Sequence, residues 1–149
     1  MKPIVLHYWP TPNGKKISIM LEEIGAAYEI RFVNIARGDQ FKPEFLAISP
    51  NNKMPAITDP EGPGGAPISM FESGAILMYL GRKAGRLYPQ EERARVEVDE
   101  CLMWQMGSVG PMLGQRAHFA VYAPARIPYA TRRYNDEAHL PYRALYRRF

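Results

Sequence analysis

The sequence has little cysteine: its 149 residues include one, Cys101. A single cysteine excludes an internal disulfide framework and a cysteine-rich metal site, and it agrees with a reducing compartment. No run approaches the roughly 18 apolar residues of a membrane-spanning helix, and the N-terminal apolar run is too short for a signal peptide. We therefore expect a cytoplasmic protein with no metal and no membrane partner.

An excess of charge is also largely lacking, because the net charge is only +4 and charged residues make up 23% of the chain. These values, with 46% hydrophobic residues, are ordinary for a globular protein. The positive surplus falls near the C-terminal end without a nucleic-acid-binding motif. We interpret it as solvated helix surface with one or two anion ligands, so nucleic acid is not an expected partner. The arginines concerned are Arg126, Arg132, Arg133, Arg143, Arg147 and Arg148.

The first 84 residues have the pattern of a compact α/β unit. Short apolar or alternating runs predict strands, and apolar residues at helical spacing predict helices between them. The order strand, helix, strand requires a parallel pair with a right-handed crossover. Ser73 is a predicted N-cap of the last helix. The expected elements are strands at residues 3–8, 28–32, 56–59 and 68–71, and helices at 17–24, at 42–46 and from 72–74 onward.

From residue 91 onward only helical patterns are present. The apolar residues Val96, Leu102, Met103 and Met106 are expected to line the first helix. The dipeptide at 110–111, glycine then proline, must bend or end that helix. A second helix is expected to start near residue 128 and to be interrupted at residue 141, where proline recurs. We divide the chain into residues 1–84, a linker at 85–90 and a helical region at 91–149.

The segment at residues 11–14 (TPNG) joins the carboxyl end of a strand to the start of a helix. Ligands favour this place in open α/β sheets. Free backbone N–H groups and the positive end of the helix dipole suit an anion or a thiolate there. The Thr11 hydroxyl and one amide could lower the pKa of a bound thiol by about one or two units. The same residues are also those of an N-capping turn that binds nothing, and both interpretations stay open.

Two later segments have a similar double interpretation. Glu72 and Ser73 at a helix start could hold the ammonium and carboxylate of an amino acid, or they could be an ordinary helix start. Met54 and Pro55 precede a strand. A cis bond between them would leave the Met54 backbone to pair with an extended peptide, whereas a trans bond would make Pro55 an ordinary edge residue.

Taken in order, these segments resemble the glutathione-site core of glutathione transferases. The matching stretches are residues 49–57 (SPNNKMPAI) and 71–77 (FESGAIL). Residues 11–14, 110–115 (GPMLGQ) and 127–134 (IPYATRRY) are similar to the bacterial Nu-class, disulfide-bond oxidoreductase subgroup. The resemblance implies an α/β thioredoxin-like N-terminal domain plus the first part of an all-α glutathione transferase C-terminal domain, in a homodimer.

The same resemblance implies a role for each motif residue, with glutathione as co-substrate. Thr11 and Asn13 would face the glutathione sulfur as a donor pair. Met54 would pair its backbone with the cysteinyl part beside a cis Pro55. The γ-glutamyl amine and carboxylate would be held by Glu72 and Ser73.

Three more residues are implicated by the resemblance. Gln40 and Lys53 would reach the glycyl end of glutathione, and Arg133 would help to hold a second glutathione. Proteins of this subgroup accommodate two glutathiones or one glutathione disulfide, and they reduce small disulfides without a protein cysteine. Cys101 is accordingly expected to be a packing residue. Tyr8 is a rival partner for the sulfur.

The predicted function is therefore that of a glutathione-dependent disulfide reductase or transferase. The alternatives are a glutathione- or protein-binding module with little catalysis, and a non-functional fragment. The family pattern continues beyond residue 149, so we expect a C-terminally truncated chain whose activity is in question. His7 and His118 are expected to be structural.

Overall fold

The computed structural model describes residues 2–148, which divide into two compact units on either side of the Glu92–Arg93 bond. The first unit contains a four-stranded sheet and three α-helices, joined by short 3₁₀ turns. Its elements are β1 (Ile4–Tyr8), α1 (Pro12–Ile24), β2 (Tyr28–Phe32), α2 (Pro43–Leu46), β3 (Ala56–Asp59), β4 (Ile68–Phe71) and α3 (Ser73–Ala84).

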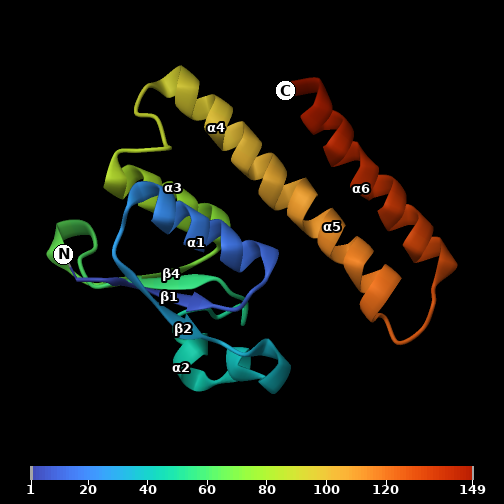
Figure 1. The fold of residues 1–149 in the computed structure, drawn as a ribbon, viewed down its shortest axis with the longest axis horizontal. Helices are drawn as coiled ribbons and strands as arrows, with labels where there is room; N and C mark the ends of the chain where they lie inside the picture. Colours follow the sequence, from blue (N-terminus) through green and yellow to red (C-terminus); the bar gives the residue numbers. More distant parts are fainter. Residues whose placement is uncertain (1, 149) are drawn as a thin grey trace. The chain divides into compact units, whose positions relative to one another are not determined.

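The sheet has the strand order β2-β1-β3-β4. β1 and β2 are parallel, whereas β3 runs antiparallel to both β1 and β4. Helices α1 and α3 cover one face and α2 lies on the other (Figure 1). This mixed sheet between helices is a thioredoxin-like domain, as predicted. The main core lies between the sheet and the α1–α3 pair, and its fully buried residues are Leu6, Ile17, Leu21, Ile57, Ile76 and Leu80.

The second unit is a helical pair. Helix α4 (Glu92–Trp104) passes through a π turn (Gln105–Val109) into α5 (Gly110–Ala117) and a second π turn (His118–Tyr122). Helix α6 (Pro128–Arg148) returns antiparallel to this run (Figure 1). The first π turn ends just before the first turn of α5, which contains Pro111, a residue without an N–H. The interruption expected near residue 110 is therefore a π turn and not a break in the helix. No helix among residues 2–148 is long and apolar enough to cross a membrane.

Two expectations for the helical unit were wrong. Helix α6 runs through Pro141 instead of being interrupted there. Pro141 is buried, and packing of that face offsets the hydrogen bond that proline cannot donate. On α4, Val96 and Met103 are 53% and 54% exposed, so they do not share a buried face with half-buried Leu102. Val96 and Met103 are seven residues apart and so lie on the same side of the helix. Leu102 is rotated by about 100° around the helix axis from Met103.

His7 illustrates how the fold uses a buried polar residue of β1. Its side chain is 3% exposed, and Nε2 lies 3.3 Å from the Thr58 hydroxyl on β3. Burial, helped by the positive charge of Arg31, lowers the pKa of His7 from 6.5 to about 4. His7 is therefore neutral at pH 7 and structural, because a charged imidazole would lose its hydration in this position.

His7 should make the fold sensitive to acid. Its pKa is depressed in the folded state, so below pH 6.5 the unfolded chain takes up the proton first. As the pH falls from 6.5 to 4, the free energy of unfolding should drop by up to about 3 kcal/mol from this group. Urea unfolding at several pH values measures the drop. The variant His7→Gln should lose that part of the pH dependence; an unchanged profile would contradict the assignment.

Candidate functional site

The strand pairing brings the three predicted motifs to one edge of the sheet. His7, near the carboxyl end of β1, pairs with Ala56 at the start of β3, and Ala56 pairs with Phe71 at the end of β4. The end of β1, the start of β3 and the end of β4 therefore lie side by side. The segments that continue from these ends are residues 11–14, Met54 with Pro55, and Glu72 with Ser73.

A second core cluster packs against the residues next to these segments. It contains Val33, Phe45, Met54 and Ala56, all buried, with Trp9, Ile48 and Phe71 packed against them. Trp9 precedes Thr11 by two residues, and Phe71 directly precedes Glu72. The backbone at each motif is thus attached to a packed side chain, which fixes the motifs relative to one another.

Thr11 is the N-cap of α1. Its φ and ψ are −96° and 160°, and its Oγ1 accepts a hydrogen bond from the Gly14 N–H at 3.2 Å. An N-cap oxygen of this kind satisfies one of the free amides of the first turn. Since the oxygen accepts, the hydroxyl hydrogen remains a donor. Residues 12–14 belong to the first turn of α1 and not to a separate turn, and Asn13 is exposed there.

Gly14 occupies a place where no side chain fits. A Cβ at this position would lie 2.4 Å from the Trp9 carbonyl oxygen and 3.0 Å from the Tyr8 ring. The glycine therefore lets α1 approach the end of β1 closely. Tyr8, the rival sulfur partner, lies with its ring over Gly14 and in edge contact with Phe32, with a centroid distance of 6.2 Å.

The Met54–Pro55 peptide bond is cis, in agreement with the family resemblance. The register of β3 with β1 begins at Ala56, so Met54 lies outside the strand pairing. The preceding loop is held by Ser49, which is fully buried and donates its hydroxyl to the Lys53 carbonyl at 2.7 Å. Lys53 itself is exposed. The loop therefore presents backbone atoms of Met54 beside an exposed cation.

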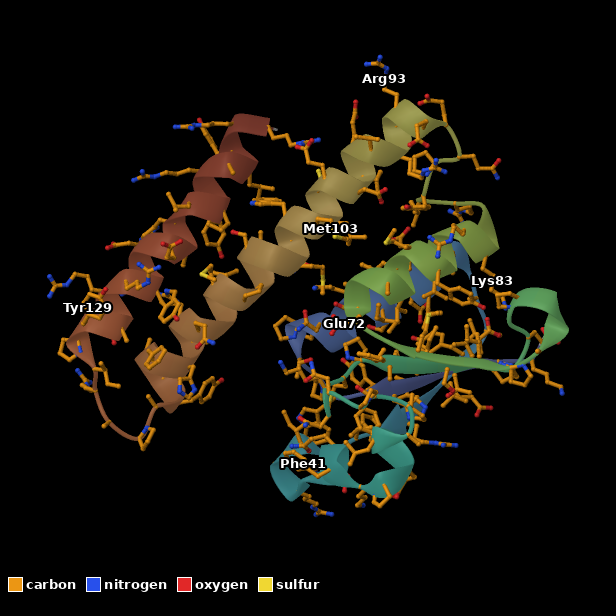
Figure 2. All side chains as sticks on the ribbon, turned by 180° about the vertical axis from the view of Figure 1, so that it is seen from behind. Phe41, Glu72, Lys83, Arg93, Met103 and Tyr129 are labelled. Carbon is orange, nitrogen blue, oxygen red and sulfur yellow. The ribbon has the colours of Figure 1, made fainter. Side chains whose placement is uncertain are left out.

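Glu72 and Ser73 differ from the prediction in one respect. The N-cap of α3 is Glu72, with φ 72° and ψ 110°, and Ser73 is the first helical residue. A positive φ is unusual for a residue with a side chain, and such conformations cluster at ligand-binding sites. Glu72 is exposed where β4 passes into α3, whereas Ser73 is only 4% exposed (Figure 2).

Lys16 is a site residue that the sequence analysis missed. Its ammonium donates to the Ser73 hydroxyl oxygen across 3.3 Å, which joins α1 to α3. Burial lowers the pKa of Lys16, and the Glu72 carboxylate acts in the opposite direction. The helical spacing could have revealed it, because Lys16 lies three residues after Asn13 and so shares its face of α1.

Gln40 lies in the 3₁₀ turn Asp39–Phe41, and its amide oxygen is buried without a hydrogen-bond partner among residues 2–148. A buried polar atom without a partner is unusual and invites a ligand donor.

Arg133 lies on α6 in the second unit, exposed and 3.8 Å from Glu137. Cys101 is half-buried on α4. Residues 2–148 contain no group of three or more His, Cys, Asp or Glu that could hold a metal ion.

The fold and this edge define a thioredoxin-like domain that carries two helix N-termini and a cis proline at its candidate ligand edge, with no cysteine in any of the three motifs. Residues 1–82 match the model of the glutathione S-transferase N-terminal domain. The chain therefore belongs to the glutathione S-transferase family.

Named relatives refine this placement. The chain is 50% identical over 146 residues to the disulfide-bond oxidoreductase YfcG of Escherichia coli, covering 97% of this chain and 68% of that protein. The predicted resemblance to the disulfide-bond oxidoreductase subgroup is thereby confirmed.

Two solved structures are similar as well. One is a glutathione transferase family member of Pseudomonas fluorescens with two glutathiones bound, with 52% identity and a TM-score of 0.88.

The other solved structure is a glutathione transferase of Pseudomonas putida with one glutathione disulfide bound per subunit, with 48% identity and a TM-score of 0.88. Each similarity covers 91% of this chain and 60% of the solved chain. This chain thus spans about three fifths of the length of these solved relatives.

Proposed function

We propose that this chain acts as a glutathione-dependent disulfide reductase or transferase in which the thiolate of bound glutathione is the nucleophile. The observation that carries the proposal is the register through Ala56, by which the segments after β1, before β3 and after β4 lie at one sheet edge. A tripeptide thiol has an amino-acid head, a backbone and a sulfur to be recognised. The segment after β4 offers a charged helix start for the head. The segment before β3 offers the Met54 backbone outside the strand pairing, and the segment after β1 offers the Thr11 hydroxyl for the sulfur.

In the proposed site, Thr11 and Asn13 face the sulfur. The Thr11 oxygen already accepts from the Gly14 N–H, so its hydrogen is available to a thiolate. The N-terminus of α1 adds a positive dipole end. Both effects favour the charged form of the thiol and lower its pKa.

The rest of glutathione would follow the sheet edge. The Met54 backbone beside Pro55 binds the cysteinyl part, and Glu72 with Ser73 binds the γ-glutamyl head. Gln40 and Lys53 bind the glycyl end; the unpartnered amide oxygen of Gln40 supports this role, because it would accept from the glycyl N–H. We assign Arg133 to a second glutathione, and a cytoplasmic homodimer is the expected state of the protein.

The reaction can be written for a mixed disulfide of glutathione and a second thiol. The bound thiolate attacks the glutathione sulfur of the mixed disulfide, and a new sulfur–sulfur bond forms as the old one breaks. The second thiol leaves as a thiolate and takes a proton from water, and glutathione disulfide is the other product. This reaction consumes one free glutathione. For a disulfide that contains no glutathione, a first glutathione thiolate attacks one of its sulfurs, releases one thiolate and forms the mixed disulfide, so two glutathiones are consumed in all.

Replacing the sulfur donor tests the proposal. Thr11→Ala removes one hydrogen bond to a thiolate, so the rate with glutathione and the mixed disulfide of glutathione and cysteamine should fall about 10- to 100-fold. The pKa of bound glutathione, followed by thiolate absorbance, should rise by about one unit or more.

Thr11→Ser is the matched control, because it keeps both the hydroxyl and the helix cap. It should retain the wild-type rate. A wild-type protein that is folded but no faster than the uncatalysed exchange would refute the enzyme proposal. Retention on immobilised glutathione without turnover would instead favour the binding module. An unchanged rate for Thr11→Ala would refute only the role of Thr11.

A further inference from the structure

Strand β2 stands at one end of the sheet order β2-β1-β3-β4, so only one of its two edges is paired within residues 2–148. On the paired edge, the Ala27 carbonyl accepts a hydrogen bond from the Ile4 N–H of β1 at 2.9 Å. Backbone direction alternates along a strand, so residues 29 and 31 face β1 in the same way. The N–H and C=O groups of residues 28, 30 and 32 therefore point outward, where another strand could pair with them.

The side chains of β2 do not protect this outer edge. Natural edge strands are commonly guarded by a proline, a bulge or repelling charges. Residues 28–32 (YEIRF) contain no proline, and Ile30 and Phe32 are 44% and 66% exposed. Glu29 and Arg31 are also exposed, and neither makes an ion pair with another described residue. The edge thus offers apolar surface and two free charges of opposite sign.

The order of these side chains is nearly the same in both directions: aromatic, charged, isoleucine, charged, aromatic. If two copies pair antiparallel about a two-fold axis at Ile30, Glu29 of each copy lies opposite Arg31 of the other. Tyr28 then lies opposite Phe32. The outward backbone groups meet in hydrogen-bonded pairs. Glu29 and Arg31 form the non-hydrogen-bonded pairs, whose Cα atoms are about 4.5 Å apart and whose side chains are closest.

The two charges also exclude the neighbouring registers. Outward backbone groups stay matched only if the two-fold axis moves by one whole residue along each strand. An axis at residue 29 places Glu29 opposite a second Glu29, and an axis at residue 31 places Arg31 opposite a second Arg31. Like charges directly opposite each other destabilise a strand pair. The charge pattern therefore favours the register centred on Ile30.

We propose that the outer edge of β2 is a self-association surface that pairs with β2 of a second copy of this chain, antiparallel and with Ile30 at the two-fold axis. The pairing joins the two sheets into one. It requires no glutathione, so it is independent of the proposed function. The contact of one five-residue edge is small, and interfaces below about 1,200 Å² are typical of transient complexes. We therefore expect reversible association.

Sedimentation equilibrium of the whole chain, from about 10 μM to 1 mM, tests the inference. The mean mass of the wild-type protein should rise with concentration. Glu29→Arg and Arg31→Glu each place like charges opposite each other in two symmetry-related pairs, so each should weaken self-association roughly tenfold or more. An equimolar mixture of these two variants should regain wild-type association, because every pair between unlike chains again has opposite charges.

Glu23→Arg is the matched control, since Glu23 is exposed on α1 and the substitution makes the same change in charge. It should self-associate like the wild-type protein. Circular dichroism checks that each variant is folded, and Glu29→Lys and Arg31→Asp replace a variant that is not. A wild-type mass independent of concentration would overturn the inference. So would self-association that persists unchanged in both single variants, or a loss that their mixture does not restore.

Discussion

Gly14→Ala is expected to destabilise the first unit by about 2 kcal/mol or more and to weaken glutathione binding at least about tenfold. The added Cβ would lie 2.4 Å from the Trp9 carbonyl oxygen, a backbone atom that cannot rotate away. That oxygen accepts a hydrogen bond from the Thr11 N–H at 2.6 Å. Any movement that relieves the contact therefore moves Thr11, the predicted sulfur donor.

The opposing effect is smaller. Alanine is a better helix former than glycine by about 1 kcal/mol, and Gly14 lies in the first turn of α1, where this gain is reduced. Gly114→Ala on α5 is the control, because a Cβ there meets no atom within 4 Å among the described residues outside its own helix backbone. It should be neutral or stabilising by up to about 1 kcal/mol. Urea unfolding and calorimetric titration measure both effects, and wild-type behaviour of Gly14→Ala would contradict the close approach.

The short strands of the first unit could be predicted because their signals are local. The expected strands at 28–32, 56–59 and 68–71 are the observed β2, β3 and β4. Each is a run of apolar or alternating residues, and β3 and β4 directly follow a proline; these signals need no knowledge of the rest of the chain. The start of α6 at Pro128 was predicted in the same way, since proline favours the first helical position.

The geometry of the site could not be predicted in this way. The motifs meet because β1 pairs with β3, a contact between residues about fifty positions apart, and no local pattern specifies that register. From the residues alone, each motif was better explained as an ordinary helix cap or turn, and only the resemblance to a family selected the binding interpretation. Lys16 was missed for the same reason, since its partner Ser73 is 57 positions away.

Two errors came from propensity rules that tertiary context overrode. Serine is a favoured N-cap, so Ser73 was expected at that position, yet Glu72 occupies it with φ 72°. Proline disfavours a helix interior, yet Pro141 lies within α6. Both rules describe average free energies of about 1 to 3 kcal/mol, which buried neighbours can outweigh. The Glu72 conformation stands at the proposed site, where such exceptions are expected.

A second large effect is expected from Asp59, which lies 1% exposed at the end of β3. Its Oδ2 accepts hydrogen bonds from the Tyr79 hydroxyl at 2.6 Å and from the Lys83 ammonium at 2.5 Å, and Oδ1 accepts from the Glu61 N–H at 2.9 Å. Lys83 also donates to the Glu61 carbonyl and lies beside the β3–β4 loop (Figure 2). The carboxylate thus ties α3 to the hairpin.

The charge of Asp59 is maintained by its donors. Burial alone would raise the pKa of the Asp59 carboxyl, but the hydrogen bonds from Lys83 and Tyr79 outweigh burial and hold the pKa below its ordinary value. Burial, with the hydrogen bond to the same carboxylate, raises the pKa of Tyr79. At neutral pH the Asp59 carboxylate is therefore ionised and the Tyr79 hydroxyl keeps its proton, so Tyr79 donates and Asp59 accepts.

Asp59→Asn should lower the free energy of unfolding by about 3 kcal/mol or more, since it removes the charge of a carboxylate that is 1% exposed while leaving its donors Tyr79 and Lys83 in place. An amide that keeps its oxygen toward Glu61 turns its NH₂ toward the Lys83 ammonium, where a donor meets a group that can only donate. Asp39→Asn is the matched control: Asp39 also pairs with a lysine, Lys42, at 2.7 Å, but the Asp39 side chain is 24% exposed against 1% for Asp59, so the loss of stability should be much smaller. Urea unfolding at pH 7 compares the two, and equal midpoints would show that the Asp59 group adds no more than a surface pair.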